Sequence, residues 1–557
     1  MNQDTKSVSF IPLGGIGDVT KNMYLYEYQD QILIVDCGIG FADETMLGVD
    51  LLIPDISYLL QTKKKIVGMV ITHGHEDHMG ALPFILPRLL ALSPFPIFAT
   101  PLTAALANEK LKEFGVSTPV QTVPFGAKSI FMGSFEVSFI RVTHSVPDSA
   151  NLFIKTPIGN LYHGSDFKFD LTPTDGKKSE LQKIAKAGAE GILCLFSDCL
   201  GSERPGRTPS EEVLSEHFEK EMRECRGKFI VTTYSSNISR LNQAIQIAEK
   251  FNRKVCFVGR SLLRAKEVAQ KLGYMKLKQG LEIQSGSVKK YDDRQLLIFA
   301  AGSQGQENSA LSRIANGDHQ DVSLKSHDVV IFSADTIPGN ESSVNFLIDT
   351  IAKKGAKVVY SDINDNFHVS GHGSSDDLML MMSLTTPKKL LPISGTFRHM
   401  VAYRLLAQKL GYRENDVFLI EDGQEVVFTK DTSYLGKKIE VRNVYVDEIT
   451  GAEVESVVLR DRQMLSEGGV VIVMAQVNSA TGQIIGNPDI ITRGFLAGEG
   501  SKLQKGLSQE IIRVLSKDKG RVTNWMHIRK LIGTTAERYI FKDLRRRPLV
   551  LPVVLEV

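Results

Sequence analysis

Cysteine, long apolar runs and an N-terminal leader are scarce or absent in this sequence. Its cysteines form no CxxC pair and show no disulfide-framework spacing, which favours a reducing compartment; they are Cys37, Cys194, Cys199, Cys225 and Cys256. Nowhere do about eighteen apolar residues follow one another, and residues 1–20 contain no signal-peptide core. We therefore expect a cytoplasmic protein with no membrane association.

An excess of charge of one sign is also missing. The 66 Lys and Arg residues nearly balance the 64 Asp and Glu residues, for a net charge of +2. Any contact with a nucleic acid must then come from a local patch rather than from a global field. The length of 557 residues predicts about three domains with sizeable cores.

What is present is a cluster of metal-binding side chains at residues 72–78. Thr72-His73-Gly74-His75-Glu76-Asp77-His78 follows the apolar run 66–71, which is typical of a buried strand, so we expect the histidines on a loop at a strand's end. Imidazole and carboxylate ligands without cysteine suit zinc or manganese at a site that keeps a position open for water. Histidines that merely solvate a turn are the less favoured reading.

Two segments before this cluster are expected to lie beside it in the fold. Residues 12–17 are a glycine loop between two strand-like runs, 8–11 and 23–26. A dinucleotide-binding loop would need a helix after the glycines, so we expect these glycines to turn the backbone beside the site. The strand-like run 31–38 contains Asp36, a carboxylate placed to orient a metal-ligating histidine, although an ordinary turn aspartate remains an alternative.

The residues after the cluster add two further candidate ligands. Residues 80–92 are typical of a helix and 95–99 of a strand. The strand-like segments 134–142 and 159–165 are then followed by His144 and Asp166. Residues that all follow strands can converge at one edge of a fold. The pattern therefore predicts a binuclear metal centre with Asp166 as the bridging carboxylate.

The order HxHxDH, His144, Asp166 resembles the metallo-β-lactamase fold. Longer motifs resemble the β-CASP nucleases, and among them the bacterial ribonuclease J family, over almost the whole chain. These motifs are residues 195–199 (Leu-Phe-Ser-Asp-Cys), 205–211 (Pro-Gly-Arg-Thr-Pro-Ser-Glu), 232–240, 335–341, 368–372 (His-Val-Ser-Gly-His) and 546–552.

This resemblance implies an α/β protein with a metallo-β-lactamase αββα core, an inserted β-CASP α/β domain and a small C-terminal α+β domain. The implied segments are 1–204 and 351–430 for the core, 205–350 for the β-CASP domain, 431–450 for a linker and 451–557 for a C-terminal dimerisation domain. Continuous apolar runs at 254–259, 296–300 and 328–333, with an amphipathic helix at 239–251, agree with a parallel sheet in the insertion.

The resemblance also implies roles for individual residues. His73, His75 and His144 match the ligands of one metal ion, Asp77 and His78 those of a second, and Asp166 the bridge, so that two Zn²⁺ ions, or Mn²⁺, are expected. Asp77, Asp198 and His368 match catalytic positions, the last two for acid–base assistance. The segment His368, Val369, Ser370, Gly371 and His372 is expected to bind an RNA phosphate.

The chain departs from the family at one ligand of the second metal. The family has a histidine in a Pro-x-His-Gly-Glu pattern, whereas residues 392–396 read Pro-Ile-Ser-Gly-Thr and place Ser394 there. A serine hydroxyl is a poor ligand for these metals, which puts the second site in doubt. His399 follows five residues later, and the sequence does not decide whether it reaches the metal.

The function implied is that of a metal-dependent ribonuclease of the ribonuclease J kind. Such an enzyme is a 5′-to-3′ exoribonuclease, with endonucleolytic cleavage as a second mode, that acts on 5′-monophosphorylated RNA in rRNA maturation and mRNA decay. The expected partners are RNA, a second copy in a homodimer or a paralogue in a hetero-oligomer, and an RNA-decay complex. The alternative is a weakly active or inactive paralogue that serves as a binding and dimerisation subunit. An enzyme preferring DNA, or a small-molecule hydrolase, is less compatible with the motifs.

Overall fold

The computed structural model describes residues 6–42, 46–337, 340–360, 367–447, 450–478, 484–495, 499–517 and 525–557. The chain divides into two compact units. The larger comprises Met1–Phe41 and Leu51–Val444, and the smaller comprises Ala42–Asp50 and Tyr445–Val557. No helix among the described residues is long and apolar enough to cross a membrane.

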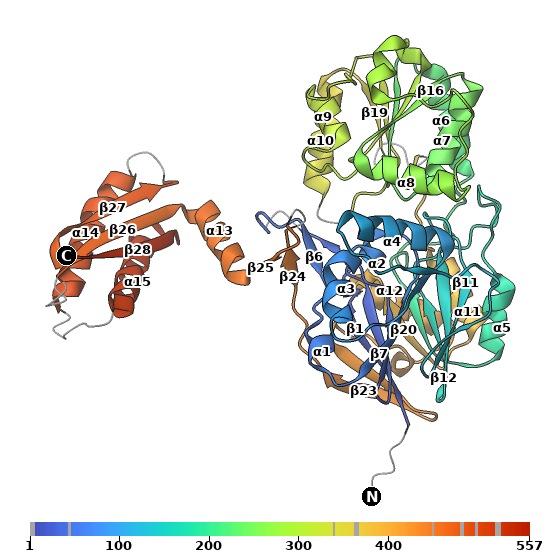
Figure 1. Ribbon diagram of the computed structural model, residues 1–557, viewed down its shortest axis with the longest axis horizontal. Coiled ribbons are helices and arrows are strands. Elements are labelled where there is room, and N and C mark those ends of the chain that lie inside the picture. Colours follow the sequence, from blue (N-terminus) through green and yellow to red (C-terminus); the bar gives the residue numbers. More distant parts are fainter. Residues whose placement is uncertain are drawn as a thin grey trace, which may run out of the picture. The chain divides into compact units, whose positions relative to one another are not determined.

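The larger unit contains two sheets that pack face to face (Figure 1). The first has the order β23 (Ser433–Lys438), β22 (Gln424–Phe428), β1 (Val8–Gly14), β3 (Met23–Tyr28), β4 (Gln31–Val35), β7 (Lys65–Ile71), β8 (Ile97–Ala99), β9 (Gln121–Thr122). The second has the order β10 (Ile130–Met132), β11 (Phe135–Arg141), β12 (Ala150–Thr156), β13 (Gly159–Gly164), β14 (Ile192–Asp198), β20 (Lys389–Ile393).

Aromatic side chains fill the space between these two sheets. The ring of Phe10 on β1 lies 4.3 Å from that of Phe196 on β14, and Tyr26 on β3 meets Phe196 edge-on at 5.3 Å. Helices cover the outer faces. α3 (Leu82–Leu90) and α4 (Pro101–Glu113) lie beside the first sheet, and α5 (Leu181–Ala189), α11 (Ser375–Thr385) and α12 (Phe397–Lys409) beside the second. This confirms the four-layer αββα arrangement.

The parallel strand pairs decide where the polar side chains gather. β4 is parallel to β7 in the first sheet, and β13, β14 and β20 are mutually parallel in the second. Asp36 and Thr72 follow the first pair, while Asp166, Asp198 and Ser394 lie at or just after the ends of the other three strands. Because parallel strands end at one edge of a sheet, these residues meet at the carboxyl edge, where ligands bind in such folds.

A further sheet, with helices on both faces, is inserted in the sequence between β14 and β20. It is entirely parallel, in the order β16 (Lys254–Val258), β17 (Leu296–Ala300), β15 (Phe229–Thr232), β18 (Val329–Phe332), β19 (Lys357–Val359). Helices α6 (Val213–Glu224), α7 (Ile238–Lys250) and α8 (Arg260–Lys271) cover one face, and α9 (Ala310–Asn316) and α10 (Glu341–Lys353) the other. The continuous apolar strands are thus buried on both faces, as the sequence predicts.

The smaller unit has its own core. Its sheet has the order β27 (Ile484–Arg493), β26 (Val470–Val477), β28 (Leu549–Glu556), with β26 parallel to β28. Alternate residues of β26, including Val471, Val473 and Ala475, are buried together with apolar residues of α14 (Glu499–Lys517) and α15 (Trp525–Leu544). The helices thus occupy one face of the sheet (Figure 1).

One expected element boundary is wrong. The histidine cluster does not lie entirely on a loop, because a short helix, α2 (Glu76–Met79), begins inside it and the predicted helix 80–92 is reduced to α3. Asp77 and His78 therefore sit on a helical turn, with His75 at its N-cap position. Acidic residues in a first turn favour a helix start, and Glu76 and Asp77 carry that signal, but a helix of four residues is too short to show a periodic pattern.

Candidate metal centre

Four of the predicted ligands form one tight group. His75 Nδ1 lies 3.2 Å from His73 Nε2 and 3.0 Å from His144 Nε2. Asp166 Oδ2 lies 3.6 Å from His73 Nε2 and 3.8 Å from His144 Nε2. Burial lowers the pKa of all three histidines, that of His144 to about 3, so each ring is neutral. We call these four residues the first group.

The donor atoms of the first group are better suited to bind a metal ion than to form hydrogen bonds with one another. Gly371 O lies 2.7 Å from His144 Nδ1, so this nitrogen must carry the proton and His144 Nε2 is left with a lone pair. Asp166 Oδ1 is buried and has no hydrogen-bond partner among the described residues. Converging imidazole and carboxylate donors without sulfur suit Zn²⁺ or Mn²⁺.

Asp77, His78 and Asp166 make up a second group. His78 Nε2 lies 3.3 Å from Asp166 Oδ2 and 3.7 Å from Asp77 Oδ2. Burial alone would lower the pKa of His78, but the carboxylates of Asp166, Asp77 and Asp36 outweigh it and raise this pKa. Its other nitrogen, Nδ1, lies 2.7 Å from Asp36 Oδ2. The prediction that Asp36 orients a histidine of the cluster is therefore confirmed.

Asp36 is itself held in place by the neighbouring strand end. It accepts hydrogen bonds from the backbone N–H of Thr72 at 2.8 Å and from the Thr72 hydroxyl at 2.9 Å. This contact joins the end of β4 to the end of β7, immediately before the histidine cluster. A carboxylate with several donors can remain buried without a large penalty, and it fixes the ring that it contacts.

The segment 368–372 lies against the first group. A Cβ on Gly371 would collide with the His144 ring, so only glycine fits there. His372 Nδ1 lies 2.8 Å from Asp198 Oδ2, and its Nε2 lies 3.9 Å from Asp166 Oδ2. Burial would lower the pKa of His372, but Asp198 and Asp166 outweigh it and raise the value to about 9. Asp198 is thus the partner of His372.

His368 and Asp198, both expected in acid–base roles, are paired with different residues. His368 Nε2 lies 3.0 Å from Asp335 Oδ2, and its Nδ1 is buried without a partner among the described residues. The backbone carbonyl of Asp335 accepts hydrogen bonds from Tyr234 Oη and from Gln304 Nε2, each at 2.8 Å. Sequence reasoning gave Asp335 no role. The available signal was a carboxylate placed shortly after a strand.

Ser394 occupies the position at which the family has a histidine ligand, and its contacts are not those of a metal ligand. Ser394 Oγ donates to Asn22 Oδ1 at 3.0 Å, and the Ser394 backbone adopts a left-handed φ of 52°. His399 lies in the first turn of α12, where its Nδ1 is 3.0 Å from Thr396 Oγ1 and its Nε2 is 3.4 Å from Glu203 Oε2. Within the described part of the chain, His399 belongs to no cluster of potential metal ligands.

A buried ion-pair cluster, which sequence reasoning missed, ties the insertion to this site. Glu211 accepts hydrogen bonds from Arg240 Nη2 at 2.6 Å and Nε at 3.1 Å, and its other oxygen lies 3.2 Å from Lys168 Nζ. Arg240 Nη1 donates to Ser333 Oγ at 2.7 Å, and Ser333 Oγ donates to the carbonyl of Phe367 at 2.6 Å. The buried ion-pair cluster therefore holds Phe367, the residue before His368, in place.

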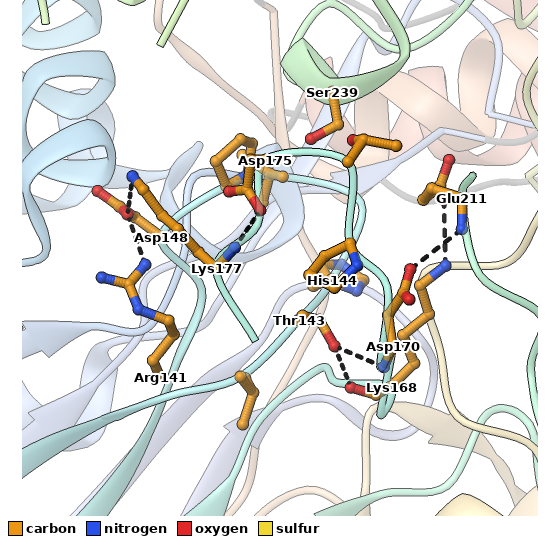
Figure 2. A pocket seen from close by; sticks show the side chains of 15 residues that line it. Arg141, Thr143, His144, Asp148, Lys168, Asp170, Asp175, Lys177, Glu211 and Ser239 are labelled. Carbon is orange, nitrogen blue, oxygen red and sulfur yellow. Dashed lines mark hydrogen bonds and ion pairs between the residues drawn. The ribbon is translucent and has the colours of Figure 1, made fainter. Parts of the chain in front are cut away.

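Figure 2 shows the cavity beside His144, where Lys168 and Glu211 come together. Its volume is about 30 Å³, which is enough for water-sized molecules but not for a nucleotide. Acidic and basic residues line it in similar numbers, among them Arg141, Asp148 and Lys177.

Four family models match the chain. They are described as "Metallo-beta-lactamase superfamily" (residues 16–149), "Ribonuclease J, beta-CASP domain" (226–351), "Zn-dependent metallo-hydrolase RNA specificity domain" (356–419) and "Ribonuclease J C-terminal domain" (457–557). The β-CASP match lies within the inserted sheet and its helices, and the C-terminal match lies within the smaller unit.

Curated relatives match over the full length. "Ribonuclease J2" of Bacillus subtilis (strain 168) is 34% identical and the match covers 100% of both chains. "Ribonuclease J 1" of Streptococcus pyogenes is 37% identical over 98% of this chain and 97% of its own, and "Ribonuclease J" of Thermus thermophilus is 37% identical over 99% and 95%. A crystal structure of a protein of unknown function from Enterococcus faecalis V583 covers 76% of this chain and 100% of its own at a TM-score of 0.54 and 17% identity, which supports the fold alone.

The buried pair of Arg240 and Glu211 generates a stability prediction. Arg240→Met keeps much of the side-chain volume but leaves Glu211 buried without its guanidinium partner. We expect the free energy of unfolding to fall by about 3–5 kcal/mol in urea titrations at neutral pH. The matched control is Arg264→Met, because Arg264 pairs with Glu113 at the surface and should contribute only about 0–1 kcal/mol.

The same pair predicts a pH dependence. Burial alone would raise the pKa of Glu211, but Arg240 and Lys168 outweigh it and lower the pKa from 4.5 to about 2. A group with a lowered folded-state pKa stabilises the protein above its unfolded pKa, and this contribution is lost as the pH falls towards the folded-state value. The stability difference between wild type and Arg240→Met should therefore shrink between pH 4.5 and about 2. A difference independent of pH would contradict this assignment.

Proposed function

Because this chain belongs to the ribonuclease J family, we propose that it is a metal-dependent ribonuclease. In this proposal it degrades 5′-monophosphorylated RNA in the 5′-to-3′ direction and also cuts internally, in rRNA maturation and mRNA decay. The observation that carries the proposal is the first group, in which three neutral imidazoles and Asp166 converge at the carboxyl edges of two sheets. A hydrolytic site needs such a donor set with an open side.

His73, His75, His144 and Asp166 would hold a Zn²⁺ or Mn²⁺ ion. Such an ion supplies Lewis acidity and lowers the pKa of a water towards neutrality. The surrounding residues keep the donors aligned: the Gly371 carbonyl fixes the protonated nitrogen of His144, and Asp36 holds Thr72 next to His73. Asp77, from the second group, faces the same centre with a carboxylate that is 21% exposed and so accessible to water.

The remaining site residues would bind RNA and move protons. Residues 368–372 would place an RNA phosphate against the first group, because Gly371 brings the backbone close to His144. Asp198 orients His372 towards Asp166. His368 would protonate the departing 3′ oxygen from Nε2, the nitrogen that lies 3.0 Å from Asp335 Oδ2, because its Nδ1 is buried. His368, Asp198 and Asp77 are therefore our candidates for catalytic residues.

The first test uses RNA with a 5′-monophosphate and a labelled 5′ nucleotide, incubated with protein and Mn²⁺ or Zn²⁺. We expect rapid release of the labelled mononucleotide, and a loss of more than about 100-fold in His75→Ala, because a ligand of the reacting centre is missing. His319→Ala is the control, since His319 accepts a hydrogen bond from the backbone of Asp321 and belongs to no cluster of potential metal ligands among the described residues. Equal activity in folded His75→Ala would contradict the proposal. Internal fragments without mononucleotides would support endonucleolytic action only.

A second test addresses His368. His368→Gln should lower kcat by about 100- to 10,000-fold with little change in KM, because a positioned proton donor acts mainly in the transition state. Bound metal, measured by elemental analysis, should not change. The control is His217→Gln, because the His217 ring lies 5.8 Å from Phe367 but belongs to none of the groups. An unchanged kcat, or a loss that follows the metal content, would remove His368 from the mechanism.

The smaller unit supports a homodimer in this proposal. Its helices occupy one face of the sheet, while apolar residues on the strands remain open: Ile485, Ile491, Leu551 and Leu555 are 37–46% exposed. Exposed apolar clusters of this kind mark interaction surfaces. A hetero-oligomer with a paralogue, or attachment to an RNA-decay complex, would use the same face.

Light scattering tests this surface. Leu551→Glu should change the mass of the purified protein from dimer to monomer without loss of helical signal, because a carboxylate would be buried in the interface. Phe131→Glu, an equally polar change at an exposed residue of β10 in the larger unit, should leave the dimer intact. A wild-type monomer, or dissociation by both variants, would contradict the assignment of the dimer to this sheet.

A second candidate function is favoured by Ser394. A paralogue with little or no activity would still bind RNA and partners, and it would keep the fold while losing a ligand. In the first test it would release no nucleotide at high protein concentration. The intact first group argues for the enzyme instead.

A further inference from the structure

Three clusters of potential metal ligands share Asp166: the first group, the second group, and Asp166 with Asp198 and His372, in which His372 Nδ1 and Asp198 contact each other. The first and second groups are unequal. The first has four donor residues, and the second has three, of which Asp166 is shared. Catalytic Zn²⁺ sites have three protein ligands and a water, whereas the second group has only two ligands that it does not share, Asp77 and His78. On the side of the second group that faces the first sheet, two hydroxyls and an amide take the place of a further ligand.

That side is occupied by a buried hydrogen-bond network of Tyr24, Asn22 and Ser394. Asn22 Oδ1 accepts a hydrogen bond from Tyr24 Oη at 2.7 Å and another from Ser394 Oγ at 3.0 Å. All three side chains are almost inaccessible to solvent. The other end of the amide lies 3.0 Å from the carbonyl oxygens of Val19 and Asp77, which can only accept, so the amide nitrogen must be at that end and Oδ1 must face the two hydroxyls.

The nitrogen of this amide meets the metal-facing side of His78. Asn22 Nδ2 lies 3.1 Å from His78 Nε2, and 3.0 Å from the carbonyl oxygens of both Val19 and Asp77. The two N–H groups of this amide donate to the carbonyls of Val19 and Asp77, so its nitrogen fills the space beside His78 Nε2 without offering a ligand atom there. His78 Nδ1 is already engaged by Asp36, so the ring has no other donor atom to offer.

The backbone of Ser394 is held by the glycine loop. Its N–H donates to the carbonyl of Gly15 at 2.8 Å, and β21 (Gly395–Thr396), which follows it, pairs in parallel with β2 (Ile16–Gly17). The glycine loop and the serine segment therefore hold one another. His399 on the same segment faces Thr396 and Glu203.

We infer that this protein holds one tightly bound metal ion, in the first group, and that the network of Tyr24, Asn22 and Ser394 closes the second group to metal. The inference rests on the proposed metal-dependent function, and it differs from the two ions per chain that the sequence leads us to expect. Catalysis would then use one ion, with His78 and Asp77 acting as hydrogen-bonding groups.

Metal content tests this inference independently of activity. The full-length protein is loaded with Mn²⁺, desalted and examined by elemental analysis and electron paramagnetic resonance. We expect about one ion per chain and the spectrum of an isolated Mn²⁺. About two ions per chain with an exchange-coupled spectrum would overturn the inference.

Two variants test the network itself. Ser394→His places an imidazole at the serine position, where the left-handed backbone is one that histidine tolerates, and Asn22→Asp replaces the amide nitrogen beside His78 by a carboxylate oxygen. Either change should raise the content to about two ions and produce the coupled spectrum. His399→Gln is the control and should leave one ion. If both variants fold and both keep one ion, the network does not close the second group and the inference is wrong.

RNA turnover on the same samples separates this inference from the proposed function. One ion per chain without turnover would contradict the ribonuclease and leave the metal count standing. Two ions per chain with turnover would support the ribonuclease and overturn the inference about the metal count.

Discussion

One buried carboxylate oxygen holds the centre of this protein together. Asp166 Oδ2 lies within 3.9 Å of ring nitrogens from four histidines, which come from both sheets and from the segment that follows the insertion. Burial alone would raise the pKa of Asp166, but His78 and His372 outweigh it and keep this pKa low. A charged group at this depth is stable only if its partners stay in place, so the fold must keep the strand ends in register.

The insertion contributes to that constraint although its own sheet lies apart from the histidines. Arg240 on α7 contacts Glu211, which precedes α6, and Ser333, which follows β18. Ser333 in turn holds the carbonyl of Phe367, the residue before His368. The β-CASP sheet is thus linked by buried polar contacts to the segment that faces the centre.

Much of the site was predictable because its residues are close in sequence or follow recognisable strands. HxHxDH after a buried run, and His144 and Asp166 after two further strands, indicate one centre without any structural information. The contacts that sequence could not supply join distant residues: Ser394 meets Asn22 across 372 positions, and Arg240 meets Glu211 across 29. Such pairs depend on how β20 sits beside the glycine loop, and on how α7 packs against the residues before α6. Periodicity does not encode either arrangement. The start of α2 was missed for a different reason, since four residues are too few to show a helical pattern.

The central claim is that the first group is the place where this chain binds the metal on which its activity depends. A crystal of the full-length protein grown with Mn²⁺, with diffraction collected on both sides of the manganese absorption edge, tests it most directly. The account predicts one strong anomalous peak, among His73 Nε2, His75 Nδ1, His144 Nε2 and Asp166. A crystal with no peak there, or with its only peak between Asp77 and His78, would contradict it.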